Sequence, residues 1–118
     1  MIGSRAFEFA RRIVKLCEVW CQRGIAGRHI AQQLIKCETS VGANAEEAQE
    51  AQTKADFIAK LCISRKEARE SIYWLRLSVD SSVGTKDEVA WELDEARQLL
   101  AIIRAAIITA RSGPDKNP

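Results

Sequence analysis

The chain has 118 residues, of which 47% are hydrophobic and 29% are charged, and its formal net charge at pH 7 is +2. This length fits one domain with its own core, and the composition excludes a disordered chain. No apolar run approaches the roughly 20 residues that a transmembrane helix needs. The first residues mix charged with apolar side chains, so we expect no secretion signal, no membrane partner and a cytoplasmic location.

The segment 4–23 has the pattern of an amphipathic helix. Ser4 is a candidate N-cap, because its hydroxyl can accept a hydrogen bond from a free backbone N–H at the helix start. Two glycines in the segment 23–28 (RGIAGR) end this helix. Large apolar side chains recur at steps of four, three and four residues: Phe9, Ile13, Leu16 and Trp20.

Two further helices are predicted over 27–51 and 52–82. Thr53 is a candidate cap between them, but good helix formers surround it, so the two could also form one kinked helix. The stripe of the first continues through a polar position: Ile30, Leu34, Cys37, Val41, Asn44 and Ala48. The stripe of the second is Phe57, Leu61, Ser64, Ala68, Ser71 and Leu75.

The stretch SSVGTKDE, residues 81–88, ends one helix and starts another. Gly84 suits a left-handed position after a helix, and Thr85 with Glu88 forms a capping-box pattern. The last helix is predicted over 86–112, so the domain spans 1–112 and 113–118 is a disordered tail. The stripe of this helix alternates steps of four and three: Val89, Leu93, Ala96, Leu100, Ile103, Ile107 and Ala110.

These elements predict an all-α fold, an antiparallel up-down four-helix bundle. The net charges of the four segments alternate in sign, which suits neighbouring helices of a bundle. The first and last helices also carry more apolar side chains than one seam uses, and this excess indicates a subunit interface. On the last helix the surplus residues are Trp91, Leu99, Ile102, Ala106 and Ile108.

One group of polar residues is predicted on the core side of the helix over 27–51. Asn44 falls on the apolar stripe, and Ser40 and Glu47 flank it. Small residues on the facing helix would let the two backbones approach closely. A buried Asn needs hydrogen bonds and often fixes helix register, so a structural role is favoured. A small-molecule or metal site in the bundle is the alternative.

Basic residues form rows on three helices. Arg97, Arg104 and Arg111 recur every seven residues on the last helix. Solubility and ion pairing account for such rows, whereas repetition around a ring would make them an electrostatic footprint for RNA or DNA. The other candidate contacts are Arg11, Arg12 and Lys15 on the first helix, and Arg65, Lys66 and Arg69, with Arg76, on the third.

The sequence contains no recognisable motif for catalysis or cofactor binding. His29 is the one histidine, so no Glu-x-x-His pair for a di-iron site exists, and no Cys or Ser has a histidine at motif spacing. The sequence has four cysteines, and we expect all of them to be reduced and buried: Cys17, Cys21, Cys37 and Cys62. We therefore expect no enzyme, no cofactor and no metal.

Residues 39–77, TSVGANAEEAQEAQTKADFIAKLCISRKEARESIYWLRL, resemble a known family. The pattern is S-[IV]-x-x-N-x-x-E, followed by F-x-x-x-L-x-x-x-x-x-E-A-x-E-x-x-Y-W-L. It is typical of the four-helix bundle proteins related to those encoded in 23S ribosomal RNA intervening sequences. The matching residues are Ser40, Val41, Asn44, Glu47, Phe57, Leu61, Glu67, Ala68, Glu70, Tyr73, Trp74 and Leu75.

This resemblance implies an up-down bundle that assembles as a ring, typically a homopentamer, with no established enzymatic activity. It makes Ser40, Asn44, Glu47, Glu67 and Glu70 the motif residues of the chain. It also implies a relation to the accessory proteins of diversity-generating retroelements, which are pentameric, strongly basic bundles that bind a reverse transcriptase and nucleic acid. A ring-forming scaffold is the favoured function, and a nucleic-acid-binding accessory protein is the alternative.

Overall fold

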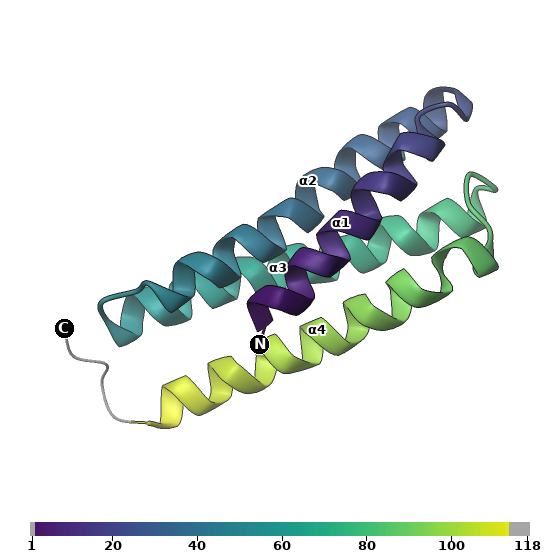
Figure 1. Cartoon of the computed structure of the whole chain (residues 1–118). Helices are drawn as coiled ribbons and strands as arrows, with labels where there is room; N and C mark the ends of the chain where they lie inside the picture. Colours follow the sequence, from purple (N-terminus) through teal and green to yellow (C-terminus); the bar gives the residue numbers. More distant parts are fainter. Residues whose placement is uncertain (1, 114–118) are drawn as a thin grey trace.

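The computed structural model describes residues 2–113, and these form four helices (Figure 1). The predicted all-α bundle is confirmed, and no strand occurs within the described residues. Of the predicted tail at 113–118, residues 114–118 lie outside the described residues. The helices are α1 (Ile2–Trp20), α2 (Gly24–Gln49), α3 (Lys54–Asp80) and α4 (Lys86–Ser112).

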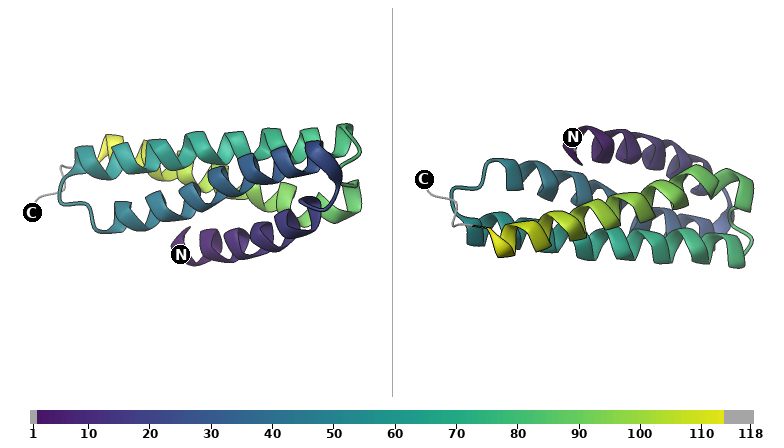
Figure 2. Two further views of the ribbon diagram at one scale, coloured as in Figure 1. Left: turned by 90° about the horizontal axis from the view of Figure 1, so that it is seen from above. Right: turned by 90° about the horizontal axis from the view of Figure 1, so that it is seen from below.

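The helices run up and down in sequence order, so that each packs against its neighbours in the chain (Figure 2). α1 also contacts α4, which closes the bundle, while α1 and α3, like α2 and α4, lie on diagonals. α1 has 19 residues and the other helices have 26 or 27. It therefore covers only part of the length of α2 and α4, as Figures 1 and 2 show.

Side-chain caps start the last two helices as the sequence predicts. The Thr53 hydroxyl accepts a hydrogen bond from the backbone N–H of Asp56 at 3.1 Å, so α2 and α3 are separate helices. Thr85 accepts from the backbone N–H of Glu88, whose carboxylate accepts from the Thr85 N–H in return. The predicted capping box is thus confirmed, and α4 has the predicted bounds.

Other predicted boundaries need correction. Ser4 is not an N-cap, because α1 already begins at Ile2. The segment 23–28 is not a long break, since α2 begins at Gly24, the glycine with a positive φ of 83°. Gly84 is not left-handed either, and Ser82 takes the left-handed position with a φ of 64°. Its neighbour Ser81 caps α3 with backbone bonds to Leu77 and Val79.

Gly27 and Gly84 are required for close packing around Trp20. A Cβ atom on Gly27 would lie 2.3 Å from the Trp20 carbonyl oxygen, and one on Gly84 would lie 2.7 Å from the indole ring. Trp20 itself is fully buried at the end of α1. The turn between α1 and α2 and the connection between α3 and α4 therefore close tightly around one side chain.

The core has two parts along the bundle. The larger part contains Trp20, Phe9, Ile13, Leu34 and Leu99 and receives residues from all four helices. The second part lies where α2, α3 and α4 continue beyond α1, and α1 reaches it only through Ile2. Its buried members are Val41, Ala48, Leu61, Ala68, Leu100, Ile103 and Ile107.

The predicted small-residue contact between α2 and α3 is confirmed. Ser64, Ala68 and Ser71 are buried on α3, and the Ser64 hydroxyl donates to the Val41 carbonyl of α2 at 2.8 Å. Such a bond between helices needs closely spaced backbones, which small side chains permit. Gly42 lies inside α2, where the Ala6 side chain of α1 packs over it, so this stretch is helix throughout.

Two glycine substitutions on α2 should change stability in opposite directions. Gly27→Ala should lower the free energy of unfolding by about 1–3 kcal/mol, because the added Cβ meets the Trp20 carbonyl. Gly42→Ala should raise it by about 1 kcal/mol, because its Cβ would lie 3.7 Å from Ala6 and alanine favours helix. Urea unfolding followed by circular dichroism measures both. Equal shifts in the two variants would contradict this account.

Candidate functional surfaces

Three ion pairs connect α1 and the turn after it to α4, and we call them the ionic seam. Arg5 donates to Glu95 at 2.8 Å, Arg12 to Glu92 at 3.3 Å, and Arg23 to Glu88 at 2.8 Å. The Arg23 hydrogen bonds hold the pKa of Glu88 below its usual value. The seam therefore neutralises the acidic edge of α4 with basic residues of α1 and of the turn that follows it.

The predicted basic cluster of α1 is largely committed to neighbours. The Arg12 guanidinium lies 4.0 Å from the centre of the Trp91 ring as well as beside Glu92. Arg11 pairs with Glu8 of the same helix at 2.7 Å. Lys15 remains exposed next to both, at a recess of about 400 Å³. Only part of this charge is therefore available to a partner.

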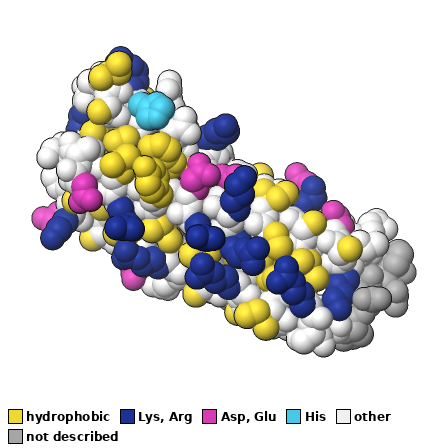
Figure 3. Space-filling model, turned by 180° about the vertical axis from the view of Figure 1, so that it is seen from behind, with side chains coloured by type: hydrophobic (Ala, Val, Ile, Leu, Met, Phe, Trp, Pro, Cys, Tyr) yellow, Lys and Arg dark blue, Asp and Glu magenta, His cyan; other side chains and the backbone are white. Residues whose placement is uncertain are grey.

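The basic residues of α3 and α4 form a different kind of surface. None of the six arginines there forms an ion pair with a carboxylate within the described part of the chain. α3 is the most distant helix in Figure 1, and the view from behind in Figure 3 shows Lys and Arg gathered over this side. We call this the arginine face: Arg65, Arg69, Arg76, Arg97, Arg104 and Arg111. Lys66 lies on α3 beside it, next to a recess shared with Arg69 and Glu70.

Two details locate the arginine face between α3 and α4. Arg76 and Arg97 line one recess of about 320 Å³, whose walls include Val89 and Leu93. At the other end, Arg111 of α4 reaches the Cys62 sulfur of α3 at 3.9 Å. The face therefore runs along most of the contact between the two helices and combines cationic side chains with an apolar floor.

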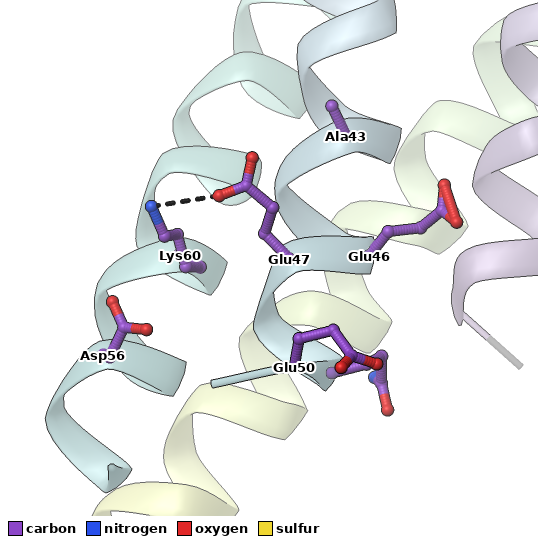
Figure 4. Close-up of a pocket in the computed structure, with 7 residues that line it drawn as sticks. Ala43, Glu46, Glu47, Glu50, Asp56 and Lys60 are labelled. Atoms are coloured by element: carbon purple, nitrogen blue, oxygen red, sulfur yellow. Dashed lines mark ion pairs between the residues drawn. The ribbon is translucent and has the colours of Figure 1, made fainter. Parts of the chain in front are cut away.

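Acidic residues gather at one end of the bundle, where α2 ends and α3 begins. They border an open recess of about 760 Å³ (Figure 4). Glu47 points to Lys60 and pairs with it at 3.2 Å, whereas Glu46 and Glu50 point away from that lysine. We call this the acidic patch: Glu46, Glu47, Glu50 and Asp56. Sequence analysis placed Glu47 beside Asn44 on the core side and did not connect it with the other three acids.

The predicted core site around Asn44 is wrong in its placement. Ser40 and Asn44 are half-buried and Glu47 is exposed, while Val41, Ala45 and Ala48 face the core. The Asn44 amide donates to the Ser40 carbonyl and hydroxyl within α2, at 2.9 and 3.0 Å, rather than across to another helix. The group therefore lies on the flank of α2, and no polar site is built in the core around it.

The motif residues Glu67 and Glu70 meet Cys37 between α2 and α3. The Cys37 thiol donates to Glu70 at 3.2 Å, and donor atoms of all three lie within 4.8 Å of one another. Burial and the Glu70 carboxylate raise the pKa of the Cys37 thiol. This set could hold a metal only by releasing the thiol proton. Sequence analysis missed it, because the residues come from two helices.

Burial also explains the other cysteine in the larger core. It raises the pKa of Cys17 to about 12, so this thiol stays protonated at neutral pH. All four cysteines are free, as predicted, although Cys21 and Cys62 are only half-buried. No helix among the described residues is both long and apolar enough to cross a membrane.

The apolar excess of α1 and α4 is partly absorbed by the core. Leu99 was assigned to the surplus, but it is fully buried in the bundle. Ile102 and Ala106 are half-buried, whereas Trp91 is 39% and Ile108 67% exposed. On α1, Phe7 is 68% and Val19 48% exposed. Large apolar side chains thus face solvent at several places along α1 and α4.

Glu38 is a buried acid that the sequence pattern did not predict. Its side chain is 0% exposed, and neither carboxylate oxygen has a hydrogen-bond partner among the described residues. Burial raises its pKa to about 9, so the carboxyl is neutral at physiological pH. It is placed at the fully buried inner face of α2, next to Cys37 in the chain.

Comparison with known proteins identifies the family. The model of the 23S rRNA-intervening sequence protein family matches residues 2–105, which is most of the chain. The chain belongs to this family. The match covers α1, α2, α3 and most of α4, so the resemblance over residues 39–77 extends to the outer helices.

A solved structure supports the same assignment. This chain is 32% identical to a protein of unknown function from the S23 ribosomal protein family of Bacteroides thetaiotaomicron, with a TM-score of 0.84. The alignment covers 91% of this chain and 98% of the other. No curated protein matches the chain. These comparisons therefore establish the fold and the family of the chain, but they give no activity.

The buried carboxyl of Glu38 should make the protein less stable as pH rises. In the folded state its carboxyl keeps a proton up to about pH 9, whereas in the unfolded chain it loses that proton near its ordinary pKa of 4.5. The stabilising effect of the neutral form is complete below the ordinary pKa and disappears as pH rises through about 9. The free energy of unfolding should therefore fall across this window.

The measurement is urea unfolding at several pH values across this window, with wild type and Glu38→Gln. The Gln variant has no titrating group at this position, so its stability should decline less steeply. Glu18→Gln, at an exposed position of α1, is the control and should follow wild type. Parallel declines in wild type and Glu38→Gln would show that Glu38 does not titrate in this range.

Proposed function

We propose that this protein is a non-enzymatic, ring-forming four-helix bundle that acts as an assembly or binding scaffold. The observation that supports it is the exposed apolar surface on α1 and α4. Phe7 and Ile108 are each about two-thirds exposed, although the chain has a complete core without them. Large apolar side chains that face solvent are candidates for protein–protein contacts, and Phe7 and Ile108 lie on different helices.

The polar groups of the chain support the same function class. The described residues bring no histidine to a cysteine, serine or carboxylate pair, and His29 instead packs edge-on against Trp74. The most shifted acid, Glu38, lies in the core away from every recess found. A general acid must reach its substrate, so this buried carboxyl is not positioned for catalysis. A homopentamer is the assembly that the family resemblance implies.

Self-association has a direct test. The chain has a mass of 13.2 kDa, so light scattering on a size-exclusion column should give a multiple of this value, five for a pentamer. Phe7→Ser with Ile108→Ser should raise the concentration at which the assembly dissociates by about tenfold or more, because each side chain would lose burial worth about 1.5–3 kcal/mol. The monomer fold should persist by circular dichroism.

Ile25→Ser is the matched control, because Ile25 is 80% exposed but lies in the first turn of α2, away from Phe7 and Ile108 in the sequence. This variant should assemble as wild type does. A monomeric wild-type protein at micromolar concentration would overturn the proposed function.

We infer nucleic-acid binding, to RNA or DNA, as the second candidate function. The arginine face supports it, because the described chain provides no carboxylate partner for its arginines, and a ring would repeat the face around its axis. The ionic seam explains why a net charge of +2 understates this surface. Glu88, Glu92 and Glu95 of α4 would otherwise offset the arginines, but they pair with α1 and the turn that follows it.

Binding to labelled single-stranded RNA, followed by fluorescence anisotropy, tests this candidate. Affinity should fall by about tenfold or more between about 50 and 200 mM salt, because phosphate contacts release counterions. Arg69→Gln with Arg76→Gln should weaken binding and flatten the salt dependence. Arg28→Gln with Lys36→Gln changes the charge equally on exposed α2 positions and is the control. Equal losses in both variants, or no binding at low salt, would exclude the arginine face.

A further inference from the structure

Surfaces of opposite charge lie on two diagonal helices of the bundle. The acidic patch is on the outer side of α2 and the adjoining start of α3. Arg97, Arg104 and Arg111, which we call the arginine row, lie on α4 at intervals of seven residues, or about 10 Å. α2 and α4 do not contact each other, so the outer sides of these helices point away from the bundle in different directions.

Most charges of both surfaces have no ion-pair partner among the described residues. In the acidic patch only Glu47 forms an ion pair, and it remains 62% exposed. Glu46, Glu50 and Asp56 form none within the described residues, and neither does any arginine of the row. The chain carries almost no net charge, so the acidic and basic surfaces arise from where the charged residues lie and not from an excess of one sign.

Each charged surface also carries one exposed apolar side chain. Phe7 lines a recess of about 440 Å³ together with Glu46, so it borders the acidic patch. Ile108 follows Arg104 by four residues and precedes Arg111 by three, so all three share one side of α4. An apolar centre with a charged rim is the usual composition of a specific protein interface.

We propose that the arginine row of one copy docks onto the acidic patch of the next copy, with Ile108 and Phe7 buried between them. This inference rests on the self-association proposed above and names its contact surfaces. The two surfaces differ, so the contact is head-to-tail, and a pair of bound copies still presents one free arginine row and one free acidic patch. Repetition of such a contact closes into a ring when the rotation between copies permits it.

A charge-swap experiment tests this contact in the full-length protein. Arg97→Glu with Arg104→Glu reverses the row, and Glu46→Lys with Glu50→Lys reverses the patch. Each double variant should give the 13.2 kDa monomer mass at a concentration where wild type assembles. The fourfold variant with both reversals should regain the wild-type mass. An equimolar mixture of the two double variants should form mixed assemblies heavier than the monomer, because each reversed surface then meets its complement on the other variant.

The rescue separates a lost contact from a lost fold, since a misfolded double variant would not assemble when its partner variant is added. Arg28→Glu with Lys36→Glu, on exposed positions of α2 outside both surfaces, should keep the wild-type mass. Circular dichroism should show the same helical content in all variants. Rescue together with an unchanged control is the result expected from the proposed contact.

The outcomes distinguish this inference from the function on which it rests. Monomeric wild type would overturn self-association and the contact together. Assembled wild type with both double variants still assembled would overturn the contact alone and place the interface elsewhere. If the row-reversed variant stays assembled but no longer binds RNA, the arginine face is a nucleic-acid surface, and the proposed contact is also overturned.

Discussion

The packing around Trp20 is the constraint on which the rest of the bundle depends. The indole ring fills the end of the core. The backbone at Gly84 lies too close to this ring for any Cβ atom, and the backbone at Gly27 lies too close to the Trp20 carbonyl. These contacts join the α1–α2 turn to the α3–α4 connection at one point. They therefore fix how far each helix is rotated about its axis, and so which side chains face solvent.

The ionic seam follows from that rotation and determines the outer charge of the molecule. Once Glu88, Glu92 and Glu95 face α1, they pair there with arginines, and the opposite edge of α4 is left with arginines alone. Individually such partly exposed pairs contribute little to stability. Their larger effect is to sort charge, so that a chain with almost no net charge has one basic face and one acidic patch.

Local sequence rules predicted the fold well where one helix is enough. Capping at Thr53 and Thr85 depends on residues within one turn, and both caps are present. The prediction of the buried side of α2 failed further along the helix. A helix has 3.6 residues per turn, so a stripe drawn in steps of three and four residues gradually rotates around it, and the buried position is Ala45 rather than Asn44. The Cys37–Glu67–Glu70 set and the pairs of the seam join different helices, so no spacing in the sequence reveals them. Glu38 was missed because an acid is normally assigned to the surface.

The short length of α1 divides the molecule into ends of unequal rigidity. Near Trp20 four helices enclose large side chains, whereas the far end is closed by three helices around smaller ones such as Ala48 and Ala68. Local opening should therefore cost less at the far end, and we expect amide hydrogens near the α2–α3 connection to exchange sooner than those beside Trp20. The acidic patch lies at this less rigid end of the bundle, so a partner that binds the patch must also order the helices that carry it.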